Sequence, residues 1–248
     1  MYTIKFSLIT ESICLIGNQT TPFSTGGVDQ STLVDIYGYP VISASSFKGA
    51  LRNIYRENRN YFTKTNEYVQ NIFNEILKRY TALICNLKKD DKGEDVNKER
   101  IEQLNNIVKK IEEKKNIPEY IFGIEELNNT PKLWFSDIKV KNKKDDIDDY
   151  FLIDMKNTIE EKDNKLESKP RTYKCIRPGV EFEGIIRFNE NGFNNNELRS
   201  QISDILCDVE KALLFFNNGF YGIGNSKSRG YGNIKIDDIT IDSTNTKV

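Results

Sequence analysis

Residues 221–234 read YGIGNSKSRGYGNI, and this glycine-rich segment separates a helical pattern from a strand pattern. Six apolar residues with helical spacing precede it: Leu198, Ile202, Ile205, Leu206, Val209 and Leu213. Four isoleucines with strand-like spacing follow from its last residue onward: Ile234, Ile236, Ile239 and Ile241. The segment therefore predicts a helix, a glycine loop and one or two final strands, in that order.

The glycine loop has the composition of a phosphate-binding segment. Glycines such as Gly222, Gly224 and Gly230 let backbone N–H groups approach a phosphate closely. Hydroxyl donors and cations lie among them, at Ser226, Lys227, Ser228 and Arg229. The loop lacks the Gly-Lys-[Ser/Thr] ending of a P-loop, and it precedes a strand instead of opening a helix as a Rossmann fingerprint does. The plainer alternative is a glycine-rich hairpin at a sheet edge.

Two elements are predicted near the N-terminus. Apolar residues alternate with polar ones at Tyr2, Ile4, Phe6 and Leu8, which predicts a half-buried strand. A helix follows, with one apolar face made by Phe47, Leu51, Ile54 and Tyr55. Ser45 and Ser46 stand just before this face and are the candidate N-cap residues.

The middle of the chain predicts a helical insertion and two more strands. Two amphipathic helical patterns fill residues 61–117, separated by the polar sequence DDKGED. Strands are expected over residues 133–140 and 180–188, with a charged stretch of little apolar periodicity, residues 141–177, between them. Without the insertion the order is β-α-β-β-α-β. The predicted fold class is α+β, with a ferredoxin-like (RRM-like) βαββαβ core.

Composition limits the chemistry of the chain. Its 248 residues include no histidine, which excludes Ser-His-Asp triads, Cys-His pairs and histidine zinc ligands. The net charge of −1, taken alone, argues mildly against a nucleic-acid-binding protein, whose surface is usually basic. Residues 165–177, however, hold five basic residues against one glutamate, so a neutral total is compatible with a basic face.

The cysteines and the apolar segments favour an ordinary cytoplasmic protein. The four cysteines are too far apart for a C-x-x-C pair and are expected to be buried or incidental thiols: Cys14, Cys85, Cys175 and Cys207. No stretch approaches the roughly 18 apolar residues that span a bilayer, and the N-terminus does not resemble a signal peptide. We expect no membrane partner.

Four segments, in order, resemble the RAMP superfamily, and in particular the repeated backbone subunit of type III CRISPR effector complexes. Residues 39–52, YPVISASSFKGALR, are similar to I-P-G-S-S-x-K-G-x-[LM]-R, with Ser43 and Ala44 in place of Pro-Gly. Residues 121–123 and 133–137, IFG and LWFSD, look like the L-F-G and L-x-F-x-D pair of the family.

The third segment and the glycine loop complete the resemblance. Residues 154–159 and 176–182, DMKNTI and IRPGVEF, resemble the K-x-x-N-x-I stretch and the I-P-x-G-x-x-F strand entry of the backbone subunit. The fourth segment is the glycine loop itself. Together the four segments cover most of the chain outside the helical insertion.

The resemblance implies one RAMP domain over residues 1–248, with a helical insertion at 61–117 and a thumb-like hairpin at 141–178. The implied partners are a guide CRISPR RNA, a target RNA, copies of the chain itself and other CRISPR effector subunits. The implied RNA-binding residues are Ser45, Ser46, Lys48, Arg52, Lys156, Asn157, Arg171, Gly222, Gly224, Ser226, Lys227, Ser228, Arg229 and Gly230.

The resemblance also implies a metal-dependent endoribonuclease. Active backbone subunits carry an aspartate in a loop upstream of the S-S-x-K-G motif, and residues 26–29, GGVD, match it. Asp29 is thus the implied catalytic and metal-binding residue, with Mg²⁺ or another divalent cation as cofactor. The expected reaction is attack by a ribose 2'-hydroxyl of the target RNA on its neighbouring phosphate. Asp35 is the rival carboxylate, although it better matches a second acidic position after the loop.

Other interpretations stay open at this point. Asp29 beside glycines is also typical of a plain turn, which would make the chain a structural RNA-binding subunit that does not cut. A guide-processing endoribonuclease of the same superfamily usually relies on a histidine, which this chain lacks. A phosphate-binding metabolic enzyme would use the glycine loop alone.

Overall fold

The computed structural model describes seven stretches of the chain: residues 2–17, 28–89, 94–114, 117–124, 132–162, 165–189 and 200–243. They form a mixed α+β protein, as the sequence predicts. Contacts divide it into unit 1, made of Met1–Ile54, Trp134–Arg187 and Glu210–Val248, and unit 2, made of Tyr55–Leu133 and Phe188–Val209. Within the described stretches, no helix combines the length and the apolar character that a membrane crossing needs.

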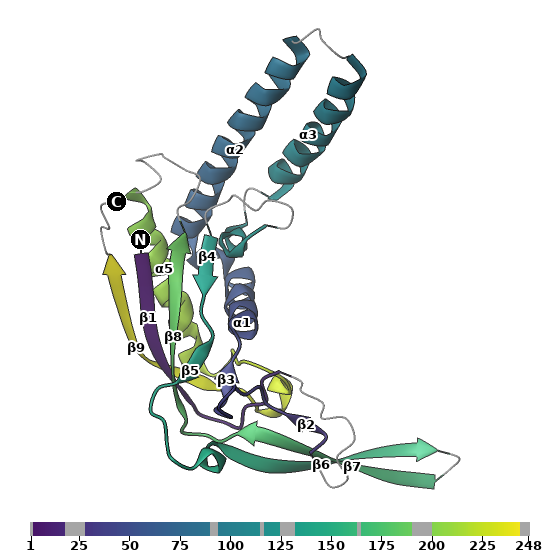
Figure 1. Cartoon of the computed structure of the whole chain (residues 1–248), viewed down its shortest axis with the longest axis vertical. Coiled ribbons are helices and arrows are strands. Elements are labelled where there is room, and N and C mark those ends of the chain that lie inside the picture. Colours follow the sequence, from purple (N-terminus) through teal and green to yellow (C-terminus); the bar gives the residue numbers. More distant parts are fainter. Residues whose placement is uncertain are drawn as a thin grey trace. The chain divides into compact units, whose positions relative to one another are not determined.

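The larger sheet joins strands from distant parts of the sequence. Its strand order is β3-β5-β8-β1-β9, and β4 also pairs with β8; β9, β1 and β8 lie side by side in Figure 1. The strands are β1 (Tyr2–Thr10), β3 (Val41–Ile42), β4 (Lys132–Phe135), β5 (Ile138–Val140), β8 (Glu181–Asn189) and β9 (Ile234–Ser243). The predicted first, third and final strands are confirmed.

An irregularity in β9 explains the uneven spacing of its isoleucines. The antiparallel register of β1 and β9 shifts between Ser7 and Leu8, which pair with Asp238 and Ile236. One residue of β9, Asp237, is therefore left without a partner on β1, as in a β-bulge. The bulge explains why Ile236 and Ile239 are three residues apart in the sequence instead of the two residues of regular strand alternation.

Aromatic rings form the core of unit 1 between the sheet and α1 (Ala44–Glu57). The ring of Phe47 on α1 stacks on Phe6 of β1 at 5.1 Å between centroids, and on Phe216 at 5.5 Å. Phe216 belongs to η4 (Phe215–Asn218), a 3-10 turn that follows α5 (Ile202–Leu214). All three rings are buried, as the apolar spacing of the sequence predicts for Phe6 and Phe47.

The predicted N-cap of α1 is wrong by two to three residues. The Ser46 N–H donates to the hydroxyl oxygen of Ser43 at 3.3 Å, so Ser43 is the capping residue. Ser45 and Ser46 lie in the first turn of the helix instead. The Ala44 N–H is satisfied by the carboxylate of Asp137 at 2.8 Å. The prediction was displaced because Ser45 and Ser46 are adjacent serines, and serine is a common N-cap residue.

The predicted second strand is two strands. Between β4 and β5, the Ser136 N–H donates to the Ile185 carbonyl at 2.9 Å. The Ile185 N–H in turn donates to the Ser136 hydroxyl at 2.9 Å. A side chain thus takes one position in the hydrogen-bonding ladder, and the strand is interrupted there.

The charged stretch forms a long antiparallel hairpin in unit 1, visible in green in Figure 1. It consists of β6 (Phe151–Lys162) and β7 (Lys165–Ile176), preceded by η3 (Ile147–Tyr150), and β2 (Gln30–Ser31) pairs with β7 in parallel. In the first half of β6 burial does not follow polarity, because the apolar Ile153 is 55% exposed. Lys156, for example, is half-buried, and Met155 is 75% exposed.

Unit 2 contains the two predicted helices of residues 61–117. They are α2 (Thr63–Lys89) and α3 (Glu94–Lys114), with η1 (Arg59–Tyr61) before them and η2 (Pro118–Phe122) after. The carboxylate of Asp208, which is 1% exposed, accepts hydrogen bonds from the N–H and the hydroxyl of Thr65, both at 3.0 Å. This carboxylate caps the first turn of α2. The helices are confirmed, and their interpretation as an insertion into one domain stays a prediction.

Candidate RNA interface

Asp29, the predicted catalytic residue, is bound to β7 of the hairpin. Its Oδ2 accepts hydrogen bonds from the Thr172 N–H at 2.6 Å and from the Thr172 hydroxyl at 3.1 Å. Its own N–H donates to the Thr172 carbonyl at 2.9 Å. Asp29 is exposed, so these contacts fix the position of a carboxylate that solvent or a ligand can reach.

The neighbours of Asp29 favour its ionised form. The Thr172 N–H, then the Thr172 hydroxyl and more weakly the charge of Arg171 lower the pKa of the Asp29 carboxyl below its usual range. Arg171 is itself an exposed residue of β7 and pairs across the hairpin with Lys156. Two predicted RNA-binding residues therefore face each other in the ladder beside the predicted catalytic residue.

Lys156 is held between the hairpin and the glycine loop. Its Nζ lies 3.7 Å from the centroid of the Tyr231 ring and 4.0 Å from Oδ2 of Asp154. The Tyr231 hydroxyl donates to the same Asp154 oxygen. This desolvated hydroxyl has a raised pKa, because burial and the nearby Asp154 both disfavour its ionisation. The glycine loop and the hairpin are thus joined by three polar side chains in mutual contact.

A small apolar cluster lies next to this junction. It contains Leu15, Cys175 and Tyr231. Burial raises the pKa of the Cys175 thiol to about 11 and that of Cys14 to about 12, so both stay protonated at neutral pH. Cys14 and Cys175 are the buried thiols that the sequence predicts, whereas Cys85 and Cys207 are exposed.

The glycine loop uses several of its N–H groups within the protein. The N–H groups of Asn225 and Gly232 donate to the carbonyls of Leu15 and Ile13, both at 2.8 Å. Gly224 has φ +76°, and a Cβ there would lie 2.3 Å from the Leu15 carbonyl oxygen. Gly222 is buried and forms a β-bridge with Asn233. These glycines therefore let two backbone segments pack closely, a role that composition alone does not distinguish from phosphate binding.

The exposed part of the loop is its basic tip. Lys227, Ser228 and Arg229 form η5 (Lys227–Arg229), and they are exposed together with Gly230. Ser226, which is partly exposed, precedes them in a left-handed conformation with φ 60°. The cations and hydroxyls expected to contact phosphate thus lie outside the segment that packs on residues 13–15.

The predicted residues of α1 have mixed exposure. Ser45 is exposed, whereas Ser46, Lys48 and Arg52 are partly buried. The Nε of Arg52 is buried and, among the described residues, has no hydrogen-bond partner. Ser43 and Ala44 bind the N-terminus of α1 through the hydrogen bonds described above, and Phe47 packs the helix on the sheet. Asn157, exposed on β6 opposite Pro170, lies beyond the Lys156 contacts.

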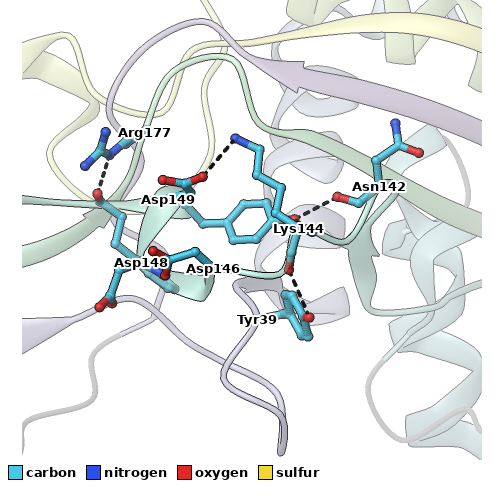
Figure 2. A network of polar contacts seen from close by, with 9 residues as sticks. Tyr39, Asn142, Lys144, Asp146, Asp148, Asp149 and Arg177 are labelled. Carbon is cyan, nitrogen blue, oxygen red and sulfur yellow. Dashed lines mark hydrogen bonds and ion pairs between the residues drawn. The ribbon is translucent and has the colours of Figure 1, made fainter.

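A polar network fixes the base of the hairpin (Figure 2). The Tyr150 hydroxyl donates to the Asn142 carbonyl and accepts from the Lys144 N–H, both at 2.7 Å. The Tyr39 hydroxyl donates to the Lys144 carbonyl at 3.3 Å, and the Arg177 side chain donates to the Phe151 carbonyl. These contacts hold η3, from which β6 begins, and so determine where the hairpin starts.

Three residues of the interface were missed by the sequence analysis: Thr172, Asp154 and Tyr231. Asp154 and Tyr231 lie inside segments that the resemblance singles out, but their contact joins positions 77 residues apart. Thr172 follows Arg171 and meets Asp29 across 143 residues. No short-range pattern predicts such pairs.

The described residues do not form a metal site by themselves. Among them, no group of three or more aspartate, glutamate, cysteine or histidine side chains is placed to hold an ion. Asp29 offers one carboxylate, of which Thr172 uses Oδ2. Mg²⁺ commonly takes one or two carboxylates and completes its shell with water and substrate phosphates. Asp29 therefore has the chemistry of a single carboxylate ligand, with Oδ1 outside its contacts with Thr172.

Three comparisons with known proteins bear on the family and the fold. The profile of the RAMP superfamily matches residues 15–235. A search of curated proteins found no match. A chain in a solved structure, described as "Cryo-EM structure of the Type III-B Cmr-beta bound to cognate target RNA", has a TM-score of 0.50 and 19% identity. That alignment covers 97% of the present chain but spans 60% of the solved chain, and its low identity makes it a likeness of fold.

Proposed function

Because the chain belongs to the RAMP superfamily, we propose that it is a guide-RNA-binding backbone subunit of a type III CRISPR effector complex that cleaves complementary target RNA. The main support for this proposal is that the hairpin β6–β7 contacts both the segment of Asp29 and the glycine loop. Asp29 is bonded to Thr172 beside Arg171, and the hairpin that bears Arg171 also presents Lys156 to the glycine loop.

The charges at this place suit an RNA backbone. Phosphates are bound mainly by lysine, arginine, hydroxyl and backbone N–H donors. Lys156 is pre-oriented by Tyr231 and Asp154, and the exposed tip of the glycine loop adds Lys227 and Arg229. The solved structure that contains the chain of similar fold is described as Cmr-beta bound to cognate target RNA, which supports RNA as the ligand here.

The fold supports the same proposal. In sequence order the core elements are β1, α1, β5, β8, α5 and β9, and the sheet order is β5-β8-β1-β9. This is the arrangement expected of the ferredoxin-like, RRM-like core that the family resemblance implies. The hairpin β6–β7 lies between β5 and β8 in the sequence, where the family resemblance implies a thumb-like hairpin. Guide RNA, target RNA, copies of the chain and other effector subunits are its proposed partners.

Cleavage is proposed to run through Asp29. The 2'-oxygen of a target ribose forms a bond to the adjacent phosphorus and loses its proton, while the bond to the 5'-oxygen breaks and that oxygen gains a proton. The ionised, exposed carboxylate of Asp29 would orient the attacking hydroxyl or serve as a ligand of a divalent cation. Mg²⁺ would supply neutralisation of the charge that develops on the phosphate. Thr172 keeps the carboxylate in place on the hairpin.

The test compares two carboxylates of the same segment in the assembled complex. Asp29→Asn keeps an oxygen for the Thr172 N–H but removes the charge, so we expect target cleavage to fall by at least about 100-fold with guide binding retained. Asp35→Asn is the matched control, and the complex that carries it is expected to cleave target RNA at the normal rate. Cleavage is followed on end-labelled target RNA, with and without EDTA.

A second candidate function rests on the same Asp29–Thr172 contact. A carboxylate that accepts two hydrogen bonds is also a structural link between β2 and β7, and the chain is then a subunit that binds RNA without cutting. Normal cleavage at every site with Asp29→Asn would establish this second function and remove Asp29 from catalysis. A guide-processing endoribonuclease is the less favoured alternative, tested by precursor cleavage with the isolated protein.

RNA binding itself has an independent test. Arg229→Gln and Lys156→Gln should each weaken RNA binding, and the slope of log affinity against log salt should become shallower by about 1 for each phosphate that is no longer bound. Lys109→Gln, an exposed lysine of α3, is the control. Equal affinity and equal salt slopes for all three variants would contradict the proposed interface.

A further inference from the structure

A second feature of unit 1 lies on the sheet, away from the glycine loop. Phe6 and Phe135 point to the sheet face that packs on Phe47 of α1. Residues that alternate with them, such as Lys5 and Trp134, lie on the other face, which we call the outer sheet face. This face contains a hollow of about 400 Å³, and every residue that lines it belongs to unit 1.

The floor of the hollow carries a buried hydroxyl. Ser7 lines the hollow and is 7% exposed. Its Oγ is buried and has no hydrogen-bond partner among the described residues. A buried polar group without a partner destabilises the folded state, and native proteins rarely keep one without a reason. A polar ligand in the hollow would provide the missing partner.

The charges around Ser7 are arranged across the sheet. Of the charged residues that line the hollow, Lys5 is paired with Asp242 and Asp137 accepts from the Ala44 N–H. The other four are Lys139 and Lys141, from β5 and the residue after it, Glu183 of β8, which lies opposite Lys139, and Asp238 of β9. With the strand order β5-β8-β1-β9, the two lysines and Asp238 are three strand spacings apart, about 14 Å. A ligand that is anionic at one end and offers hydroxyl donors at the other matches this arrangement, because carboxylates only accept hydrogen bonds and ammonium groups only donate them.

An aromatic platform lies on the same face. The Trp134 side chain is 49% exposed, and the Arg187 guanidinium stands over its ring at 5.0 Å from the centroid. Arg187 follows Glu183 by four residues on β8, so the platform lies about 13 Å along the strand from Glu183. Ile185, which also lines the hollow, lies between them in the sequence. Exposed aromatic rings paired with arginine are the surfaces on which unstacked bases bind.

We propose that the outer sheet face is a second binding site for single-stranded RNA. The lysines at β5 bind a phosphate, Ser7 and Asp238 bind ribose hydroxyls, and a neighbouring base stacks on Trp134. The hollow has the size of a small-molecule pocket, so a free nucleotide shares the chemistry of this site. The platform beyond it favours a strand of more than one nucleotide. The site shares no residue with the interface of the hairpin and the glycine loop.

Photo-cross-linking locates the RNA directly. The full-length protein is irradiated with a short single-stranded RNA that contains 4-thiouridine, and cross-linked peptides are identified by mass spectrometry. We expect a cross-link in the tryptic peptide of residues 133–139, which contains Trp134. Cross-links confined to the hairpin and the glycine loop would remove the second site while leaving the proposed function intact. A cross-link between this peptide and a second copy of the chain would identify a protein contact and overturn the RNA assignment.

Binding measurements test the chemistry. In a Lys156→Gln/Arg229→Gln background, the residual RNA affinity measured by fluorescence anisotropy should fall at least about 5-fold with Lys139→Gln or Trp134→Ala. Lys109→Gln should leave it unchanged. Unlabelled RNA should displace the probe, and displacement by AMP at equal concentration would assign the site to a free nucleotide instead.

Ser7→Ala separates a binding role from a structural one. Loss of an unpartnered hydroxyl should leave the melting temperature unchanged or higher, while RNA affinity in the same background falls. A lower melting temperature with unchanged affinity would show that the hydroxyl serves the fold, and would overturn its assignment to the ligand.

Discussion

Nζ of Lys156 lies 3.7 Å from the centroid of the Tyr231 ring, so a cation on the hairpin rests on an aromatic ring of the glycine loop. The Tyr231 hydroxyl also reaches Asp154, two residues before Lys156 on β6. One tyrosine therefore contributes a ring contact and a hydrogen bond, and single substitutions separate the two.

We expect Tyr231→Phe to destabilise the protein by about 1.5–3 kcal/mol, the usual contribution of a hydrogen bond to a charged group, while the ring stays under Lys156. Tyr231→Leu should cost more, because it also abolishes the cation–π interaction. Urea denaturation measures both. Tyr37→Phe is the control, since that ring is 65% exposed. Equal stabilities for Tyr231→Phe and wild type would show that the hydroxyl of Tyr231 is satisfied equally well by water.

The lowered pKa of Asp29 predicts a pH dependence with a definite sign. The folded state favours the carboxylate, so Asp29 adds stability above its unfolded pKa of about 3.9, and this contribution disappears as pH falls through the lower folded value. Carboxyl NMR titration reports that folded value. Thr172→Val keeps the N–H donor, the larger cause, and removes the hydroxyl, so the pKa of Asp29 should rise only part of the way. An unchanged titration in Thr172→Val would exclude the hydroxyl as a cause.

The cap of α1 predicts unequal effects for neighbouring serines. Ser43→Ala removes the acceptor of the Ser46 N–H and should cost about 1 kcal/mol of unfolding free energy. Ser45→Ala lies in the first helical turn and should change stability by less than about 0.5 kcal/mol. Thermal or urea unfolding distinguishes the two, and a larger loss of stability at Ser45 would make Ser45 the capping residue.

Alanine substitutions at two glycines of the loop should also have unequal effects on stability. A Cβ at Gly224 would lie 2.3 Å from the Leu15 carbonyl oxygen, whereas a Cβ at Gly230 meets nothing within 4 Å. Both have positive φ, so Gly230→Ala should cost about 1–2 kcal/mol from backbone strain alone. Gly224→Ala should cost clearly more, because the loop must also move away from residues 13–15. Similar stabilities of the two variants would contradict the close packing of Gly224.

Periodicity predicted the parts of the fold that bury one regular face. The alternation in β1 and the helical spacing around Phe47 led directly to the right elements, because their polar and apolar residues are sorted by burial. The hairpin was not recognisable as two strands, since both of its faces are polar or partly exposed. There, the family resemblance predicted a hairpin where the residue pattern did not.

The candidate site was predictable only as a set of separate segments. Asp29 is distant in the sequence from Lys156 and Arg171, and the structure brings all three to one hairpin. The contacts that organise them depend on Thr172 and Tyr231, whose partners are distant in the sequence. Lys48 and Arg52 were singled out by a motif alone, and both are partly buried on α1. Their roles in RNA binding stay predictions.

The bulge of β9 has a consequence for how the protein behaves at high concentration. In the described sheet β9 is an outer strand, and such a strand offers unpaired backbone groups to other molecules. Asp237 interrupts its regular pairing, and Asp238 and Asp242 place negative charge along it. A strand of another molecule therefore cannot pair easily with β9. This edge is expected to aggregate less than a regular, uncharged strand rich in isoleucine would.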